Sequence, residues 1–589
     1  MKPKMLAVLL FSSAFALSAC TDTTEQQAQR DKREPEAATG IIAKDAAIGS
    51  EYMVAAATPQ AAAAGQEILA QGGSAIDAAV AVQAMLTLTE PQSSGIGGGA
   101  FILYWDNQSK QLYTIDAREK APATAGPDLF LDANGQPPEN FWDAVIGGRS
   151  VGTPGVLKGL ELAHQRWGKT AWSELFASTI TAAEEGFTVS PRLELLLEME
   201  LNPGLPNMKA GADYFYPDGQ ALQAGSIKQN PELAWALKLV AEQGTDAFYK
   251  GPIAEKIVNA VNTSERSPGL LTLEDLANYE AIVREPVCNG YRVYTVCGMG
   301  PPSSGGLTVL QILGILENFP VANWQPDSVE FAHHFTQASR LAFADRNRYI
   351  ADEDFVDVPM THMLQKSYLA ERSRRIGNRD LNKAVPGEFK SIAFADDQSP
   401  EFPNTSHISI VDAQGNAVSM TTSIEMGFGS AVMASGFLLN NQLTDFSLVP
   451  SVDGKLIANR VQGSKRPRSS MSPTMVFDAE GDDLIHVVGS PGGARIINYV
   501  AQTLVGLLDW QLNMQQAIDL PHITNLNNYT ALEKGTAMAE LQRKLERKGH
   551  KARVTDLNSG LHGITILPDG RLLGGADPRR EGVALSAQD

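Results

Sequence analysis

The chain has 589 residues, of which 43% are hydrophobic and 20% charged, and its formal net charge is −19 at pH 7. This mixture is typical of globular proteins and excludes a disordered or fibrous chain. The negative balance repels phosphate backbones, so no nucleic acid is expected as a partner.

Residues 1–19 have the layout of a secretory signal. Two lysines precede an apolar run from Met5 to Leu17, which is too short to remain as a membrane-spanning helix. The ending Leu-Ser-Ala-Cys at Cys20 resembles a bacterial lipobox, in which the cysteine carries the lipid. We expect a lipid on Cys20, a flexible polar tether over residues 20–44, and an exported lipoprotein on the periplasmic side of a membrane. A plainly cleaved signal and a soluble periplasmic protein are the alternative.

A helix, a glycine loop and a hairpin are predicted next along the chain. A capping box beginning at Ser74 precedes residues 75–87, which are apolar nearly all round and predict a buried helix. The loop 91–100 leads into two strand-like runs, 101–105 and 111–115. The loop partly matches a dinucleotide fingerprint, but a phosphate-binding loop follows a strand and opens a helix. Here the order is reversed, so we interpret the loop as a tight turn packing near a site.

The rest of the chain alternates between helical and strand-like regions. Residues 155–350 are mainly helical, and a second hairpin with period-two alternation is predicted from residues 407–411 and 417–424. Two strand-rich regions and two sets of helices indicate stacked sheets covered by helices on both sides. The remaining predicted helices are 231–243, 253–261, 307–317, 329–350, 496–508 and 536–548, and the remaining strands are 475–478, 484–488, 563–567 and 572–574.

Cofactor and metal sites are not indicated by any motif. The nine histidines include one adjacent pair, and the thiols lack ligand spacing, so no metal and no cofactor are predicted. The usual serine-hydrolase signatures are absent. Cys288 and Cys297 lie on a possible hairpin, and export would allow a disulfide between them, with two unpaired buried thiols as the alternative. The basic run 465–468 is interpreted as a solvated loop rather than a substrate clamp.

Several motifs follow one another along the chain: Asp116–Pro122, Gly152–Gly155, Pro301–Gly306, Asn404–His407, Asn440–Phe446, Ser469–Thr474 and Gly489–Arg495. This ordered series resembles the γ-glutamyltransferases (γ-glutamyltranspeptidases or glutathione hydrolases), and the similarity runs from about residue 50 to about residue 580. The resemblance implies an α+β fold, the N-terminal-nucleophile hydrolase αββα sandwich, built from a large fragment, 45–404, and a small fragment, 405–589, that remain together as a heterodimer.

Thr405 is the expected nucleophile. A threonine hydroxyl needs a base, and an N-terminal threonine carries one, its own α-amine, with a reference pKa of about 8. The resemblance implies that Thr405 Oγ first attacks the carbonyl of Asn404, giving an ester that water opens. It also implies that the Ser423 hydroxyl, in place of the family's common Thr, bonds to the nucleophile. Gly492 and Gly493 can supply backbone N–H donors to an oxyanion.

A γ-glutamyl group carries an α-carboxylate and an α-ammonium, so its pocket needs both charges. Arg118 can bind the carboxylate bidentately, and Asp445 can pair with the ammonium. In several family members a lid loop covers the substrate and a Tyr closes it, but the corresponding loop 447–468 has no Tyr. The assisting residues are Ser469 and Ser470 for the carboxylate, and Gln442 and Glu425 for the ammonium. Glu425 stands where many members have Asn and others have Glu.

The expected function is transfer of γ-glutamyl from glutathione or related compounds to Thr405 and then to water, an amino acid or a peptide. A glutaryl or cephalosporin acylase of the same family is one alternative, and an unprocessed, inactive binding protein is another. Glutaryl groups lack the ammonium, and an unpaired buried carboxylate is costly, so retention of Asp445 favours γ-glutamyl substrates. The sequence leaves open the balance of hydrolysis and transpeptidation, the physiological donor and acceptor, the closing of the lid and the membrane that holds the lipid.

Overall fold

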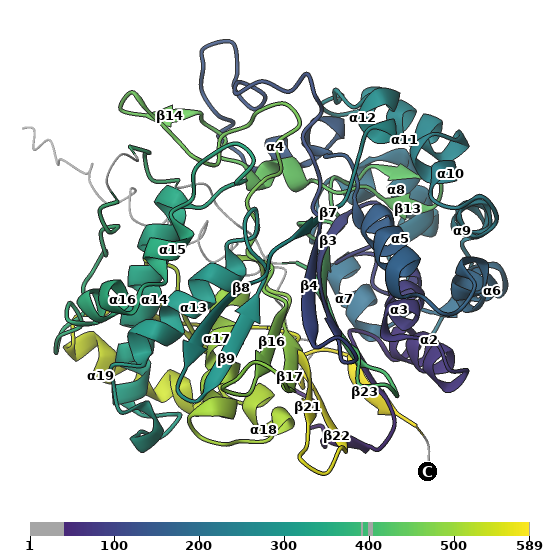
Figure 1. Ribbon diagram of the computed structural model, residues 1–589. Helices are drawn as coiled ribbons and strands as arrows, with labels where there is room; N and C mark the ends of the chain where they lie inside the picture. The colour runs from purple at the N-terminus through teal and green to yellow at the C-terminus, as the bar shows by residue number, and fades with distance from the viewer. Residues whose placement is uncertain (1–40, 390–392, 398–403, 588–589) are drawn as a thin grey trace, which may run out of the picture.

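Two seven-stranded antiparallel sheets, stacked face to face, form the centre of the molecule (Figure 1). The computed structural model describes residues 41–389, 393–397 and 404–587; the predicted signal, Cys20 and most of the predicted tether lie outside this part. Helices cover the outer face of each sheet, which confirms the αββα architecture expected from the sequence. Within the described ranges, no helix has the length and apolar character needed to cross a membrane.

The first sheet contains the predicted hairpin that begins beside Thr405. Strands β10 and β11 pair from Ser406 opposite Thr422 to Val411 opposite Ala417. They lie between two strands from much earlier in the chain, β2 and β3. In sheet order the strands are β23 (Val583–Ser586), β2 (Met53–Ala56), β10 (Ser406–Val411), β11 (Ala417–Ser423), β3 (Gly99–Asp106), β4 (Gln111–Ala117) and β7 (Ile282–Arg284).

The second sheet also mixes strands from before and after residue 404. Four adjacent strands, β22, β21, β17 and β16, come from residues after 404. They are flanked by strands from residues before 404, β1 on one side and β9 and β8 on the other. In sheet order the strands are β1 (Ala47–Gly49), β22 (Leu572–Ala576), β21 (His562–Ile566), β17 (Leu484–Gly489), β16 (Thr474–Phe477), β9 (Tyr294–Gly298) and β8 (Val287–Tyr291).

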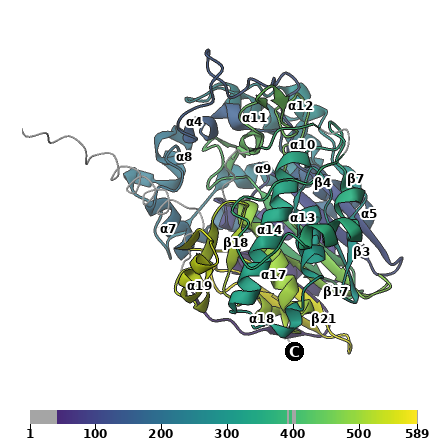
Figure 2. The ribbon, with the colours of Figure 1, turned by 90° about the vertical axis from the view of Figure 1, so that its left-hand side faces the viewer.

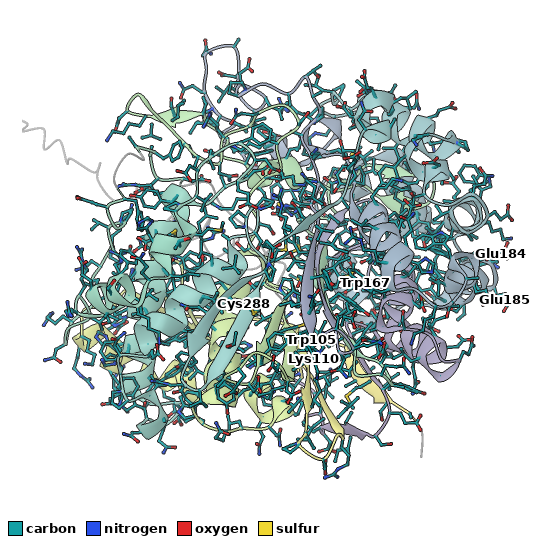
Figure 3. All side chains as sticks on the ribbon, viewed as in Figure 1. Trp105, Lys110, Trp167, Glu184, Glu185 and Cys288 are labelled. Atoms are coloured by element: carbon teal, nitrogen blue, oxygen red, sulfur yellow. A yellow bond between two sulfur atoms is a disulfide. The ribbon has the colours of Figure 1, made fainter. Side chains whose placement is uncertain are left out.

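Successive side chains of strand β3 point alternately to the two faces of the first sheet, and so into two different layers of the core. Tyr104 points to the helices and stacks on Trp167, with ring centroids 4.3 Å apart. Trp105, the next residue, points into the space between the sheets and contacts Phe477, with centroids 4.8 Å apart. Figure 3 shows Trp105 and Trp167 on the two sides of this sheet. Because both faces of the strand are buried, nearly every residue of β3 is apolar.

The helices form the two outer layers (Figures 1 and 2). Ser74 caps the start of helix α3, because its Oγ accepts a hydrogen bond from the Asp77 amide at 3.2 Å. All residues of this helix are buried, as predicted. Predicted helix 536–548 divides into a 3₁₀ turn, Ala537–Leu541, and α19. The first sheet is covered by α2 (Pro59–Ala70), α3 (Ala75–Thr89), α5 (Val156–Trp167), α6 (Ala177–Glu185), α7 (Pro191–Glu198), α9 (Pro231–Gln243) and α11 (Pro252–Asn262), and the second by α13 (Gly305–Leu316), α14 (Val329–Tyr349), α17 (Ile496–Leu508), α18 (Met514–Ile518) and α19 (Gln542–Arg547).

Shorter elements lie around these layers. Their helices are α4 (Trp142–Val145), α8 (Lys209–Phe215), α10 (Asp246–Tyr249), α12 (Leu273–Ala277), α15 (Met360–Met363) and α16 (Lys366–Ser373). Their strands are β5 (Phe187–Thr188), β6 (Ile227–Lys228), β12 (Met433–Ala434), β13 (Phe437–Leu438), β14 (Ser451–Val452), β15 (Lys455–Leu456), β18 (Ile523–Asn525), β19 (Thr530–Glu533) and β20 (Ala552–Thr555).

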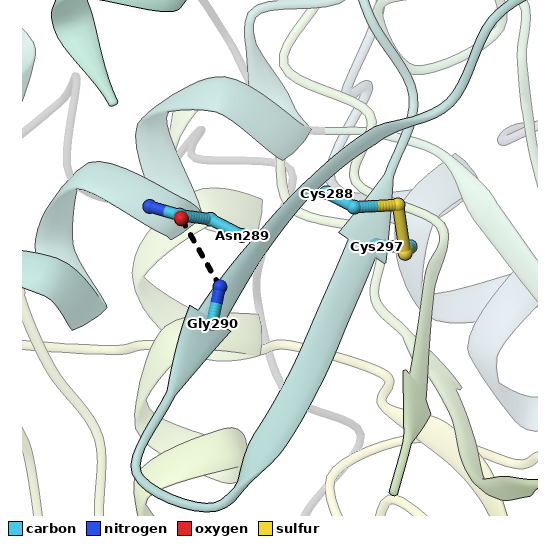
Figure 4. Close-up of a disulfide and its surroundings, with 4 residues drawn as sticks. All are labelled: Cys288, Asn289, Gly290 and Cys297. Atoms are coloured by element: carbon cyan, nitrogen blue, oxygen red, sulfur yellow. Dashed lines mark hydrogen bonds between the residues drawn. A yellow bond between two sulfur atoms is a disulfide. The ribbon is translucent and has the colours of Figure 1, made fainter. Parts of the chain in front are cut away.

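A disulfide joins Cys288 and Cys297 across the β8–β9 hairpin (Figure 4). The two residues are direct partners in the strand register, and their Cα atoms are 4.1 Å apart. Cys297 is buried, whereas Cys288 lies on the outer side of this edge hairpin. The bond therefore closes a short loop at the edge of the second sheet.

Replacing both cysteines with serine should lower the free energy of unfolding by about 2–3 kcal/mol, because the bond restricts a short loop in the unfolded chain. Urea denaturation of the wild type and of Cys288→Ser/Cys297→Ser measures the difference. Reductant should destabilise the wild type and leave the double variant unchanged. Equal stability of the two proteins under oxidising conditions would contradict the prediction.

Candidate active site

Thr405 lies immediately before β10 at one end of the first sheet and is only 3% exposed. The antiparallel pairing of β10 with β11 brings it next to Ser423, and the two hydroxyl oxygens are 3.4 Å apart. Ser423 Oγ donates to the carbonyl of Asn404 at 2.9 Å and accepts from the Glu425 amide at 2.8 Å. Thr405 Oγ is also hydrogen-bonded to the Asn404 carbonyl. Two hydroxyls thus contact the carbonyl of the Asn404-Thr405 bond.

The loop after α3 holds Asn404. Asn404 Oδ1 accepts hydrogen bonds from Ser93 Oγ at 2.7 Å and from the Thr405 amide at 3.1 Å, and Asn404 Nδ2 donates to the Gln92 carbonyl. The sequence predicts that this loop packs near a site, but Gln92 and Ser93 were not predicted to hold Asn404. Their only signal was the polar Gln-Ser-Ser run between a buried helix and a strand.

A buried ionic network supports the start of β10. Ser406 Oγ donates to Glu90 Oε2 at 2.5 Å, and Arg580 Nη1 lies 3.9 Å from Glu90 Oε1. Arg580 Nη1 also donates to the Thr405 carbonyl at 3.4 Å. Burial raises the pKa of Glu90, although Arg580 acts in the opposite direction. None of these contacts was expected from the sequence.

A cavity opens beside Thr405 and gathers most of the residues predicted for the site. Gly493 contributes to its wall, but Gly492, the preceding residue, does not. Both glycines have positive φ angles, 130° and 53°, which other residues rarely adopt. The residues that line the cavity are Arg118, Thr405, Ser423, Glu425, Gln442, Asp445, Ser469, Ser470, Met471, Gly493 and Ile496.

Arg118 and Asp445 were assigned to opposite ends of a substrate, and in the structure they pair with each other. Arg118 Nη2 is hydrogen-bonded to Asp445 Oδ2. Gln442 Nε2 donates to the same Asp445 oxygen at 3.1 Å and to Glu425 Oε2 at 3.3 Å. Burial lowers the pKa of Arg118, but Asp445 and other carboxylates raise it more, so the guanidinium stays charged. The cavity therefore presents one strong cation and two acidic side chains close to a hydroxyl.

Ser469 and Ser470 are held by the loop before α13 and by α14. The Ser469 amide donates to the Pro302 carbonyl at 3.0 Å, and Ser304 Oγ donates to the Ser469 carbonyl at 2.6 Å. Arg346 donates from Nη2 to Ser470 Oγ at 2.6 Å and from Nε to Ser304 Oγ at 2.8 Å. The motif around Ser304 therefore acts by positioning the serine pair. The role of Arg346 was not predicted from the sequence.

Comparison with known proteins decides the family. The model of the family described as gamma-glutamyltranspeptidase matches residues 61–587. The chain belongs to this family. It is 38% identical to the glutathione hydrolase proenzyme of Bacillus subtilis (strain 168), with 92% of each chain covered, and 38% identical to that of Escherichia coli (strain K12), with 90% of each covered. It is also similar to the crystal structure of cephalosporin acylase from Bacillus halodurans, with a TM-score of 0.81, 28% identity, and 93% of this chain and 98% of that chain covered.

In this member of the gamma-glutamyltranspeptidase family, the basic run at the end of loop 447–468 is buried, so our interpretation of it as solvated is wrong. Arg466 Nε lies 3.3 Å from Asp116, and Arg468 Nη2 lies 3.0 Å from Asp397. Lys465 Nζ donates to main-chain carbonyls of the same loop at 2.6 and 3.2 Å. The counter-charges of Arg466 and Arg468 come from distant segments, and this pairing allows the two guanidinium groups to be buried.

Glu119 is a buried acid next to Arg118, with Oε2 3.6 Å from Arg118 Nη1. Burial raises the pKa of Glu119 from 4.5 to about 8, although Arg118 lowers it. The folded protein thus holds a proton that the unfolded chain releases above pH 4.5. The stability gained from this proton is complete below that pH and is lost as pH rises through about 8.

Glu119→Gln should therefore remove part of the decline in stability between about pH 5 and pH 8. Free energies of unfolding at several pH values measure this slope for the variant and the wild type. Glu139→Gln, at an exposed acid of the same region, is the matched control and should keep the wild-type slope. Parallel curves for Glu119→Gln and the wild type would contradict the prediction.

Proposed function

We propose that the chain cuts itself between Asn404 and Thr405, and that Thr405 then serves as the nucleophile of a γ-glutamyl transferase and hydrolase. One observation carries the proposal: a buried threonine hydroxyl lies beside a cavity that has a guanidinium and a carboxylate, Arg118 and Asp445, on its wall. A γ-glutamyl group has the complementary carboxylate and ammonium. Such a pair of charges near a nucleophile suits this group better than an uncharged acyl group.

The contacts around Asn404 support self-cleavage. When Thr405 Oγ attacks the carbonyl carbon of Asn404, negative charge develops on the oxygen that already accepts a hydrogen bond from Ser423. The C–N bond breaks, its nitrogen takes the hydroxyl proton, and Asn404 is left as an ester on Thr405. Water then hydrolyses the ester to give a carboxylate on Asn404 and a free N-terminal Thr405. Ser93 and Gln92 keep Asn404 still during these steps.

The new α-amine of Thr405 serves as the base in the transfer reaction. It accepts the hydroxyl proton while Oγ attacks the γ-carbonyl of the substrate. Backbone N–H groups at Gly492 and Gly493 stabilise the developing oxyanion, and Ser423 orients Oγ. The leaving amine departs with the proton, and a γ-glutamyl ester remains on Thr405. Attack by water completes hydrolysis, and attack by the amine of an amino acid or peptide completes transfer.

Glutathione and related γ-glutamyl compounds are the proposed substrates. Support comes from the relatives named glutathione hydrolase proenzyme and from the acid–base pair at the cavity. Ser469 and Ser470 assist Arg118 at the carboxylate, and Gln442 and Glu425 assist Asp445 at the ammonium.

Similarity to a cephalosporin acylase favours glutaryl compounds as the second candidate. Asp445 would have no ammonium to bind in that case.

Denaturing gel electrophoresis and N-terminal sequencing test this proposal together. Purified protein should give a large fragment ending at Asn404 and a small fragment starting at Thr405, and it should release p-nitroaniline from γ-glutamyl-p-nitroanilide faster than from glutaryl-p-nitroanilide. A small fragment with a different start would overturn the assignment of Thr405. A faster glutaryl reaction would overturn the choice of substrate.

We also propose that a lipid on Cys20 holds the enzyme on the periplasmic side of a membrane. The lipobox-like ending of the apolar N-terminal run supports this proposal. Radioactive palmitate fed to expressing cells should label the wild-type large fragment and not that of Cys20→Ala. Equal labelling of the two would contradict lipid attachment at this residue.

A further inference from the structure

The end of the proposed large fragment is attached to the loop beside the cavity. Residue Ala395 forms a parallel bridge with Ile457 of that loop, and the Asp397 amide donates to the Asn347 carbonyl of α14 at 2.9 Å. Asp397 is 3% exposed, and its carboxylate lies in the interior. The bridge at Ala395 and the main-chain bond at Asp397 therefore hold this carboxylate in place.

Two side chains of loop 447–468 donate to the Asp397 carboxylate. Asn459 Nδ2 lies 3.1 Å and Arg468 Nη2 lies 3.0 Å from Asp397 Oδ2. Arg468 is itself only 3% exposed. A buried guanidinium requires a counter-charge, and a charge-assisted hydrogen bond is about twice as strong as a neutral one. Asp397 thus fixes the conformation of both loop residues.

Asn459 extends this attachment to Asp445. Asn459 Nδ2 also donates to the Asp445 carbonyl at 2.7 Å, and the Asn459 carbonyl accepts from the Ser447 amide at 2.9 Å. Asn459 Oδ1 accepts from the Arg468 amide at 2.9 Å. The main chain at and after Asp445 is thereby held in one place relative to Asp397.

Arg468 extends the attachment to Arg118. The Arg468 carbonyl accepts from Arg118 Nη2 at 3.0 Å, and the preceding carbonyl, of Pro467, accepts from Arg118 Nε at 3.2 Å. These bonds set the plane of the guanidinium that faces the cavity. The orientation of Arg118 therefore depends on the main chain at Arg468, whose side chain is paired with Asp397.

We propose that Asp397 is a positioning residue that sets the distance and orientation of Arg118 and Asp445 for the two charges of a γ-glutamyl substrate. This inference rests on the proposed function of the cavity. Asp397 belongs to the proposed large fragment, whereas Asn459, Arg468 and Asp445 belong to the small one. After the proposed cut, Asp397 near the end of the large fragment therefore still positions substrate-binding residues of the small fragment. Asp397 contacts neither Thr405 nor the reacting carbonyl. Its loss should therefore weaken substrate binding, seen as a higher KM, and leave the chemical step, seen as kcat, nearly unchanged.

Asp397→Asn keeps the shape of the side chain and removes its charge. We expect KM for γ-glutamyl-p-nitroanilide to rise about 10- to 100-fold, the equivalent of one charged hydrogen bond, with kcat changed less than about 3-fold. Asp396→Asn is the matched control. Asp396 pairs with Arg348 at 2.7 Å, both side chains are about 30% exposed (29% and 32%), and such a pair contributes little. Its KM should equal that of the wild type.

Asn459→Ala provides a second measurement, because it removes the bridge to Asp445 and leaves Asp397 paired with Arg468. Its KM should rise about 3- to 10-fold. The proposal is overturned if Asp397→Asn has the KM of Asp396→Asn, or if kcat falls while KM is unchanged. If Asp397→Asn gives no folded protein, an unchanged KM in Asn459→Ala overturns it. Failure of the proposed function would appear separately, as a wild type without fragments or without γ-glutamyl activity.

Discussion

Replacing Thr405 with alanine should leave the chain uncut and lower γ-glutamyl transfer by at least about 10⁴-fold, because both steps require the same hydroxyl. The side chain is small and lies at the start of β10, so the fold should be retained. Denaturing electrophoresis measures the cut, and p-nitroaniline release from γ-glutamyl-p-nitroanilide measures the transfer. The variant should show one band even after long incubation.

Thr405→Ser is the matched control, because serine retains the hydroxyl and loses only a methyl group. It should give both fragments and measurable activity, each at a lower rate than the wild type. Two fragments from Thr405→Ala would show that another residue makes the cut. Full activity in an uncut Thr405→Ala protein would exclude an N-terminal nucleophile altogether.

Asp445→Asn should lower kcat/KM for γ-glutamyl-p-nitroanilide by about 10²- to 10³-fold, since the substrate ammonium would enter a site without its counter-charge. The same change should leave the glutaryl-p-nitroanilide reaction unchanged or faster. Glutaryl has no ammonium, and Arg118 would be released from its pair with Asp445 to bind the carboxylate. The ratio of the two kcat/KM values is the quantity to measure.

Asp453→Asn is the control for this change. Asp453 lies at the exposed turn between β14 and β15, and its φ angle of 50° is one that asparagine tolerates. This variant should keep the wild-type ratio. An equal loss for both substrates in Asp445→Asn would mean that Asp445 acts only by holding Arg118 and does not bind the ammonium.

Local patterns in the sequence were sufficient to predict the elements that carry the site. Strands β10 and β11 follow from alternation around a polar turn, and α3 follows from its capping box and continuous apolar run. These signals depend on neighbouring residues, so they can be read without the fold. The stacking of two sheets was inferred from the order of strand-rich and helical regions and is confirmed.

Contacts between distant segments could not be predicted in the same way. The basic run 465–468 has the composition of a solvated loop, but Asp116 and Asp397 approach it only in the folded chain. Ser93 likewise reaches Asn404 from more than three hundred positions away, by a side-chain hydrogen bond that leaves no periodic signal. The motifs indicated which residues would surround Thr405, and the fold determined that Arg118 and Asp445 would contact each other.

The arrangement of strands in the two sheets has a consequence for denatured enzyme. In the first sheet, β10 and β11 lie between β2 and β3, and β23 pairs with β2. In the second sheet, β22 pairs with β1 and β16 pairs with β9. The proposed fragments therefore share backbone hydrogen bonds in both sheets. The uncut chain folds as one molecule, and its refolding is unimolecular. Once cut and unfolded, the two pieces must find each other in solution, so the recovery of active enzyme should fall on dilution. At high dilution we therefore expect the uncut chain to refold and the two separated fragments of the proposed cut enzyme not to reassemble.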